Sequence, residues 1–447
     1  MIRREDGFTL VELIITMLIF VLVIAASSNI FSSLLNQFKQ QSKIAETSIE
    51  GAVVLDMMRV DIQQAGFGIP WNLETVGAED GLDAWTTLAG NYREAVSNAG
   101  GNADPSDASY YNDGTPASAL PAPAQQRAPR GVLAQNRVGI MPNTANTPLS
   151  DYLVVKATSL GINAAAQKWT HITNFMDDSG NTWNLDPRVW NDTNNPVNPK
   201  NAVEDLVDGT DQVIVQRPAM GPGGAQMRVL ITSTAAGTPA FSALFHDTAA
   251  AFLPAAFQPV LGTGETHFIY GVGLSALRAP FNRADFYVSR PPANVPAQCA
   301  PNTGILYKAV MTNSTGMTGG QFTELPILDC VADMQVVFIT DVDNNGTPEW
   351  NNADFPYTGG LNAQQIRSQL RGVVVYILAH EGQIDHNYTF SNFSAGCAGV
   401  ANCIRVGDLS PTGTLLGREF DLSVIGANFL NYRWKIYTIS VKLLNLG

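Results

Sequence analysis

The feature that most constrains this chain is an apolar stretch near its N-terminus, from Phe8 to Ala26. Its only polar side chains are Thr9, Glu12 and Thr16, and a short polar segment precedes it. A helix of this length rises ~28 Å, close to the thickness of a bilayer core. The stretch therefore predicts a membrane-spanning helix. A secretory signal peptide fits less well, because no small-residue cleavage site ends the apolar part and the helical pattern continues.

The carboxylate of Glu12 is out of place in such a span. A charged side chain there costs on the order of 2.5–3.5 kcal/mol on insertion scales, so it needs a partner. If the chain were cut after Gly7, Phe8 would carry a free ammonium group at the start of the helix. Glu12 would then neutralise that amine, or the amine of a neighbouring copy in a helical assembly.

The run Gly7-Phe8-Thr9-Leu10-Val11-Glu12, followed by an apolar helix, resembles the class III signal of type IV prepilins and type II secretion pseudopilins. The resemblance implies cleavage between Gly7 and Phe8 by a membrane prepilin peptidase, and N-methylation of Phe8. It also implies that Glu12 pairs with a neighbouring subunit's amino terminus during assembly. The alternative is an ordinary N-terminal anchor that happens to contain a glutamate.

This sequence departs from the usual pattern in two ways. Arg3 and Arg4 are offset by Glu5 and Asp6, whereas such leaders are usually basic. The apolar helix also lacks the proline that many major pilins carry, so we expect it to be straight.

The helical pattern continues beyond Ala26 as far as the glycines and proline of 66–70, which end any helix. A helix from Phe8 to about Ala65 would be ~87 Å long. Its second half would cover a sheet, and two helices broken near Gly51 are the alternative. The apolar residues that we expect on one stripe are Phe31, Leu34, Phe38, Ala45, Ile49, Ala52, Met57 and Val60.

Composition bounds the remainder of the chain. A length of 447 residues suggests about two or three domains. The net charge of −13 does not favour a nucleic-acid-binding surface. From about 72 to 150 the sequence is rich in Ala, Asn, Gly, Pro and Ser, which predicts a loop-rich surface insert.

The four cysteines all lie in the last third of the chain. Beyond a membrane anchor they predict disulfide bonds, and three pairings are possible. We favour Cys299 with Cys330 and Cys397 with Cys403. A zinc site is the alternative, but there is no Cys-x-x-Cys pair and no nearby histidine pattern.

Strand-like runs accumulate after the insert, with one short helix at 361–370, and the closing run from Trp434 to Leu443 alternates as a half-buried antiparallel strand should. The fold class is therefore α+β, with a long helix packed on an antiparallel sheet. The order resembles the large PilW-type minor pilins, which pair an arginine-led strand such as Arg371–Ala379 with a closing strand after an arginine, here Arg433. The expected strands lie at 152–157, 212–215, 228–232, 267–272, 286–289, 304–310, 325–339, 373–379 and 434–443.

A candidate calcium loop follows the 325–339 strand. Its motif is Asp-x-Asp-x-Asn-Gly, in which oxygen ligands alternate with spacers and the glycine permits a sharp turn. The twelfth position is Asn352 instead of glutamate, so either the affinity is lower or a residue from elsewhere, such as Asp354, completes the site. The alternative is a polar β-turn. The expected ligands are Asp341, Asp343, Asn345, Thr347 and Glu349.

Two other features of the sequence bear on binding or catalysis. Trp169, Trp183 and Trp190 lie in one loop-like region and would form a carbohydrate platform or anchor that loop. The histidines are scattered, and an enzymatic site would require the fold to bring His380 close to Asp341. We therefore expect that the protein is not an enzyme.

The sequence thus predicts a leader at 1–7, a transmembrane or filament-core helix at 8–30, its amphipathic continuation at 31–65, and an extracytoplasmic globular domain at 66–447. For the PilW-type group, the resemblance implies a structural subunit at or near the pilus tip that primes assembly. Its partners would be major and minor pilins, the prepilin peptidase, the inner membrane and a tip adhesin. It would move from the inner membrane to the pilus surface. The alternatives are a type II secretion minor pseudopilin and an adhesin that binds a surface ligand.

Overall fold

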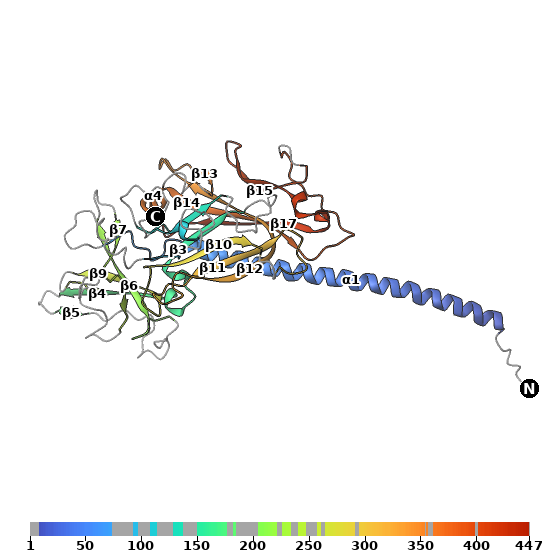
Figure 1. The fold of residues 1–447 in the computed structure, drawn as a ribbon, viewed down its shortest axis with the longest axis horizontal. Helices are drawn as coiled ribbons and strands as arrows, with labels where there is room; N and C mark the ends of the chain where they lie inside the picture. Colours follow the sequence, from blue (N-terminus) through green and yellow to red (C-terminus); the bar gives the residue numbers. More distant parts are fainter. Residues whose placement is uncertain are drawn as a thin grey trace, which may run out of the picture.

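A computed structural model describes the chain over residues 9–73, 93–96, 108–113, 128–136, 150–176, 182–184, 204–220, 226–233, 240–246, 257–260, 264–290, 295–353, 355, 361–397 and 401–446. One long helix projects from a head made mainly of strands (Figure 1). The α+β class expected from the sequence is confirmed.

Helix α1 (Leu10–Gln63) is continuous over 54 residues. It ends just before Gly66 and Gly68, both of which have positive φ angles and allow the chain to turn back over the sheet. The break considered near Gly51 does not occur. Gly51 instead allows close packing, because a Cβ atom there would lie 2.9 Å from the Tyr437 hydroxyl oxygen.

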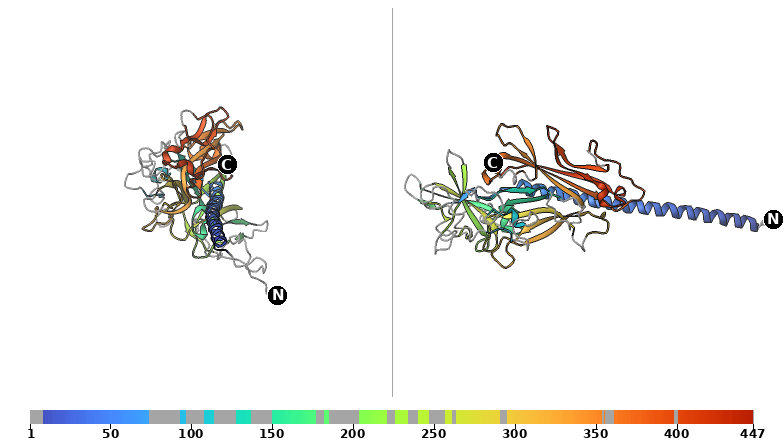
Figure 2. Two further views of the ribbon diagram at one scale, coloured as in Figure 1. Left: turned by 90° about the vertical axis from the view of Figure 1, so that its right-hand side faces the viewer. Right: turned by 45° about the horizontal axis from the view of Figure 1, so that its top comes forward.

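The two halves of α1 have different surroundings. Up to Lys39 its described side chains are exposed, and this half extends away from the head (Figures 1 and 2). The second half docks, starting where the Gln40 amide donates a hydrogen bond to the Ile384 carbonyl oxygen. Lys308 of β11 forms an ion pair with Asp61 at 2.6 Å near the end of the helix. The helix is thus held by the head only along its second half.

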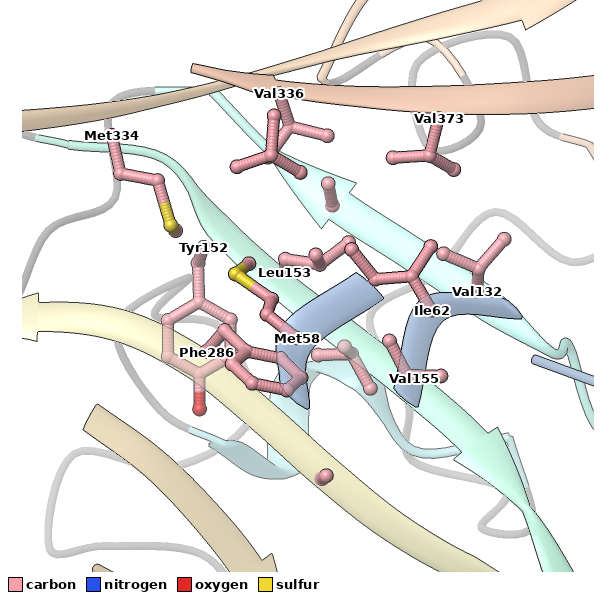
Figure 3. Close-up of a cluster of buried hydrophobic side chains, with 14 of the residues drawn as sticks. Met58, Ile62, Val132, Tyr152, Leu153, Val155, Phe286, Met334, Val336 and Val373 are labelled. Carbon is pink, nitrogen blue, oxygen red and sulfur yellow. The ribbon is translucent and has the colours of Figure 1, made fainter. Parts of the chain in front are cut away.

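The face of α1 that packs on the head differs from the expected stripe. The buried side chains of α1 are Thr47, Val54, Met58 and Ile62, whereas the expected apolar stripe faces solvent. Figure 3 shows Met58 and Ile62 among Leu153, Val155 and Phe286 of the sheet. The helix carries apolar residues on two faces, and periodicity alone does not distinguish the face that docks.

The sheet beneath α1 has eight strands in the order β17-β14-β12-β11-β10-β3-β2, with β13 paired to β12. All of its pairings are antiparallel. The strands are β2 (Val132–Gln135), β3 (Tyr152–Ala157), β10 (Asn282–Ser289), β11 (Gly304–Met311), β12 (Phe322–Thr340), β13 (Glu349–Asn352), β14 (Leu370–Glu381) and β17 (Arg433–Lys442), and the short helix α4 (Ala363–Gln369) precedes β14.

Alternate residues of β14 serve two hydrophobic cores. Val373, Val375 and Ile377 belong to the core that includes α1. Val374 and Leu378 pack on the opposite face, beneath the hairpin of β15 (Cys403–Leu409) and β16 (Leu415–Asp421). The central sheet is therefore covered on both faces, which explains the uninterrupted apolar run of β14.

Apart from the short strand β1, the second sheet is formed by chain inserted between β3 and β10 of the first sheet, which pair with each other. It lies at the end of the head remote from the N-terminus (Figures 1 and 2). Its order is β1-β7-β6-β9-β4-β5, with β8 paired to β6. The strands are β1 (Asn72–Leu73), β4 (Trp169–Met176), β5 (Thr182–Asn184), β6 (Gln212–Met220), β7 (Gln226–Leu230), β8 (Ala243–Leu244) and β9 (Glu265–Gly273).

Parts of the expected surface insert at 72–150 lie in the interior. Glu94 and Asp113 form ion pairs with the fully buried Lys156 of β3, at 2.8 and 2.5 Å. Arg283 and Asp285 of β10, both fully buried, form a second ion pair beside them. These described segments of the insert are thus fastened to the sheet by charges that are paired inside the head.

Candidate functional site

The beginning of α1 places the Glu12 carboxylate at the helix N-terminus. Glu12 Oε2 accepts hydrogen bonds from the Thr9 backbone N–H and from the Thr9 hydroxyl, both at 3.0 Å. The Thr9 hydroxyl in turn accepts from the Glu12 backbone N–H at 3.3 Å. This reciprocal capping box needs Ser or Thr three residues before Glu, a signal that the sequence carries and that our sequence analysis did not use.

The capping box holds Glu12 beside the peptide group that joins Phe8 to Thr9. A carboxylate is stabilised there by the unpaired N–H groups and the dipole of the helix. Gly7 and Phe8, the expected processing residues, lie outside the described residues. The geometry suits Glu12 for binding an ammonium group near the start of the helix, either its own or a neighbour's.

The exposed half of α1 is apolar and uncovered. Among the described residues, α1 is the one helix that is long and apolar enough to cross a membrane. Phe20, Ile24 and Phe31 have 65%, 52% and 63% of their surface exposed, although they are large and apolar. A bilayer or the helices of other subunits would remove this surface from water.

The uncovered apolar surface continues along the docked half as an outer stripe, which we define as Ile49, Val53, Met57 and Val60. Their exposed fractions are 66%, 60%, 39% and 48%. The spacings of four, four and three residues keep them on one side of the helix, opposite to the face that contacts the sheet. The outer stripe therefore extends the apolar surface of the projecting half over the head.

The expected calcium loop joins β12 to β13. Asp341 is buried, and its Oδ2 lies 3.2 Å from Arg371 Nη2. The same Nη2 donates to the Asn344 side-chain oxygen at 3.2 Å. Asp343 accepts from the Asn345 backbone N–H, and Asn345 Oδ1 accepts from the Thr347 N–H. Four of the expected ligands thus lie in the loop and Glu349 begins β13, and the guanidinium group of Arg371 lies beside Asp341.

Two residues near this loop bear on how a site would be completed. Glu349 Oε2 accepts from the Val342 backbone N–H at 2.9 Å, so this carboxylate turns back over the loop. Asn352 instead accepts from the Gly417 N–H with its side-chain oxygen, and so binds the β15–β16 hairpin. Asp354 lies outside the described residues. The role of Arg371 was missed because the pairing of β12 with β14, which brings it to the loop, is not visible in the sequence.

His380 and Asp341 do not form the site that an enzyme would require. Asp341 follows Thr340, which pairs with Leu370 at the start of β14, whereas His380 pairs with Trp434 near its end. His380 is buried against the rings of Tyr432 and Trp434, and burial lowers its pKa to about 4. Its Nε2 accepts a hydrogen bond from the Ala300 N–H at 2.8 Å. These contacts give His380 a structural role.

Disulfide bonds join Cys299 to Cys330 and Cys397 to Cys403. A nitrogen of His380 lies within 4.8 Å of the first pair of sulfur atoms, a proximity that the sequence did not suggest. Because each sulfur is bonded to another sulfur, neither pair offers a thiolate to zinc.

Of the three tryptophans considered as loop anchors or as a carbohydrate platform, Trp169 is the one whose side-chain surroundings the structure describes. Trp169 begins β4 and lies half-buried against Tyr270, with ring centroids 6.4 Å apart. Trp183 lies on β5, where its backbone pairs with Phe175. Trp190 lies outside the described residues. The contact of Trp169 with Tyr270 fits the anchoring role, which the sequence favoured over sugar binding.

Comparison with known proteins gave one family. The family model described as the prokaryotic N-terminal methylation motif matches residues 2–28. The comparisons with curated proteins and with solved structures returned no match. The match covers the capping box and most of the exposed apolar half of α1.

Proposed function

We propose that this chain, whose methylation motif and long apolar helix fit a type IV prepilin-like protein, is a minor pilin that assembles into a type IV pilus. The observation that carries the proposal is the exposed half of α1. It begins with a carboxylate at the helix N-terminus and presents uncovered apolar side chains beyond the head. Such a segment is suited to a membrane first and to a bundle of like helices afterwards.

The proposed mechanism is assembly. The prepilin peptidase removes residues 1–7, and the projecting half of α1 then anchors the subunit in the inner membrane with its head in the periplasm. Glu12 pairs with the amino terminus of a neighbouring pilin as the subunit leaves the bilayer. This pairing offsets the cost of a carboxylate in an apolar medium. None of these three steps requires catalysis by this chain, and we expect it to have no enzymatic activity.

A position at the pilus tip is supported by the size of the head. Its second sheet lies at the end remote from the projecting helix (Figure 1). A subunit repeated tightly along a shaft would have to accommodate this bulk at every step, whereas a terminal subunit would not. A tip position would also bring the second sheet into contact with a tip adhesin or an external surface.

The outer stripe supports a role inside an assembly as well. Ile49, Val53, Met57 and Val60 continue the apolar surface of the membrane-spanning half onto the head. We infer that the apolar helix of a neighbouring subunit covers this stripe in the filament. The expected occupant is a helix because the uncovered surface is itself a strip along a helix.

The test is expression of the full chain in a pilus-producing host, followed by N-terminal sequencing and isolation of sheared filaments. Wild type is expected to begin at methylated Phe8 and to appear in small amounts in filaments. Glu12→Gln is expected to be processed normally but to be lost from filaments. Val53→Glu, on the outer stripe, is expected to reduce incorporation and leave the fold intact.

Glu46→Gln is the matched control, because Glu46 is an exposed carboxylate on the same helix, where it pairs with Lys43 at 2.6 Å. It should be incorporated like wild type. If wild type keeps Met1 and remains in the membrane fraction, the chain is an anchored periplasmic protein and the pilin proposal is wrong. Recovery with type II secretion components in place of pilus subunits would support the pseudopilin alternative.

A further inference from the structure

We propose that the β12–β13 loop is a calcium site, and that Arg371 occupies it in the absence of the metal and is displaced when calcium binds. The loop runs from Asp341 to Pro348 between two paired strands, so both of its ends are fixed. Asn344 and Gly346 have φ angles of 55° and 81°, which produce the sharp turn that a metal loop requires. The turn alone would also fit a simple hairpin, so the argument rests on Asp341.

Asp341 carries a carboxylate oxygen that nothing satisfies in the structure. Its side chain is 8% exposed, and its Oδ1 is buried without a hydrogen-bond partner. A buried polar atom left unpaired is unfavourable, and a carboxylate oxygen more so. The other oxygen of the same carboxylate accepts a hydrogen bond from Arg371, which also donates to Asn344 of the loop. A cation in the loop would satisfy the unpaired oxygen.

The other groups around this carboxylate are hard oxygen donors. Asp343, Asn345 and Glu349 supply side-chain oxygens, and Thr347 supplies its carbonyl oxygen. The carboxylates of Asp341, Asp343 and Glu349 do not lie together within 4.8 Å in the structure. They would have to draw together around the ion. This flexible, oxygen-only set fits calcium better than magnesium, which demands a near-ideal octahedron.

Arg371 holds the position of a cation in this arrangement. Its guanidinium group bridges Asp341 and Asn344, at 3.2 Å from each. The side chain is 40% exposed, so it can turn into solvent without crossing the interior. Its Nη1 also donates to the Ser368 carbonyl oxygen of α4, which gives it a second partner after displacement. Calcium binding would therefore release the contact between the loop and the start of β14.

The experiment is calorimetric titration of Ca²⁺ into the full chain, purified in detergent and freed of metal with a chelator. Without the bidentate acid at position twelve, we expect a dissociation constant in the weak extracellular range, about 10⁻⁴–10⁻³ M. Asp343→Asn should weaken binding about tenfold or more, because it removes one of three carboxylates. Asp343 is exposed, so this variant should keep the fold and the thermal unfolding of wild type.

Arg371→Gln distinguishes a calcium site from a β-hairpin loop that binds no metal and is stabilised by the ion pair of Arg371 with Asp341. If Arg371 competes with the ion, its removal should tighten calcium binding about fivefold, as expected for the loss of one exposed ion pair. Arg433→Gln is the matched control. It removes a similarly exposed arginine from its ion pair with Asp385. Arg433 pairs with Glu381 at the far end of β14 from Arg371, so the dissociation constant for calcium should not change.

Three results would overturn the inference. No heat of binding from wild type at about ten times the expected dissociation constant would exclude the site. Equal affinity for Mg²⁺ would exclude its selectivity for calcium. An unchanged dissociation constant in Arg371→Gln would exclude competition by the arginine.

Discussion

The buried imidazole of His380 makes the stability of the head depend on pH. Burial lowers its pKa to about 4 from an ordinary value of 6.5. Between these values the unfolded chain binds more protons than the folded head. The contribution of His380 to the free energy of unfolding is therefore fully present above about pH 6.5. It falls as the pH is lowered toward 4, by about 3 kcal/mol in total.

Urea unfolding of the full chain in detergent, between about pH 7 and pH 4.5, would measure this dependence. His380→Gln keeps a hydrogen-bond acceptor for the Ala300 N–H but does not titrate, so its stability should fall less steeply with acid than that of wild type. His386→Gln serves as the control, because His386 is exposed. Equal slopes for wild type and His380→Gln would show that other groups account for the acid sensitivity.

At the scale of elements, the contact between α1 and β17 depends on Gly51. Gly51 faces Tyr437, whose hydroxyl donates a hydrogen bond to Glu381 at 2.9 Å. A leucine at position 51 would displace this ring and lift the helix from the sheet. We expect Gly51→Leu to cost about 1–3 kcal/mol of unfolding free energy, as overpacked positions do.

Ala52→Leu is the matched control, since Ala52 is the next residue along the helix and is exposed. It should change stability by less than about 0.5 kcal/mol. Chemical unfolding curves of the two variants provide the comparison. A Gly51→Leu protein as stable as wild type would mean that the helix can move on the sheet without loss, and that this close packing is not required.

The elements differ in how far the sequence could predict them. The strands β3, β11, β12, β14 and β17 were recognised, because apolar runs and alternation reflect the backbone period directly. The docking face of α1 was assigned wrongly, because Val54, Met58 and Ile62 form as regular a series as the outer stripe. Two equivalent stripes on one helix leave the choice to tertiary contacts, which no local pattern contains.

In the candidate site, too, local motifs could be predicted from the sequence and tertiary contacts could not. Glu12 and the loop acids were found because their chemistry is local, each within a short motif. Arg371 and the unpaired oxygen of Asp341 depend on strand pairing between distant segments. The buried partners of Lys156 were missed for the same reason, because an isolated charge in a loop-like composition indicates solvent exposure unless its counter-ion is known.

At the scale of the whole molecule, two sheets share one head, and α1 packs on the first of them. Most strands of the second sheet lie between β3 and β10, which pair with each other in the first sheet, so the sequence order alone does not separate the two sheets. The two are joined through shared packing, since Phe67 contacts the cores of both. The expected globular head therefore contains two packed sheets, a division that the sequence did not indicate.

The way α1 packs on the head predicts how much of the helix can be deleted without unfolding the head. Up to Lys39 the described side chains of α1 are exposed, whereas Val54, Met58 and Ile62 are buried in the core. Removal of residues 1–38 should therefore leave a folded head whose unfolding free energy matches that of the full chain within about 0.5 kcal/mol. Removal of residues 1–58 should prevent folding, because it strips side chains worth about 2–5 kcal/mol each from the core. Circular dichroism melts and light scattering would compare the two fragments. If the shorter deletion also unfolded the head, the projecting half of α1 would be needed for stability, and its free apolar surface would no longer point to assembly.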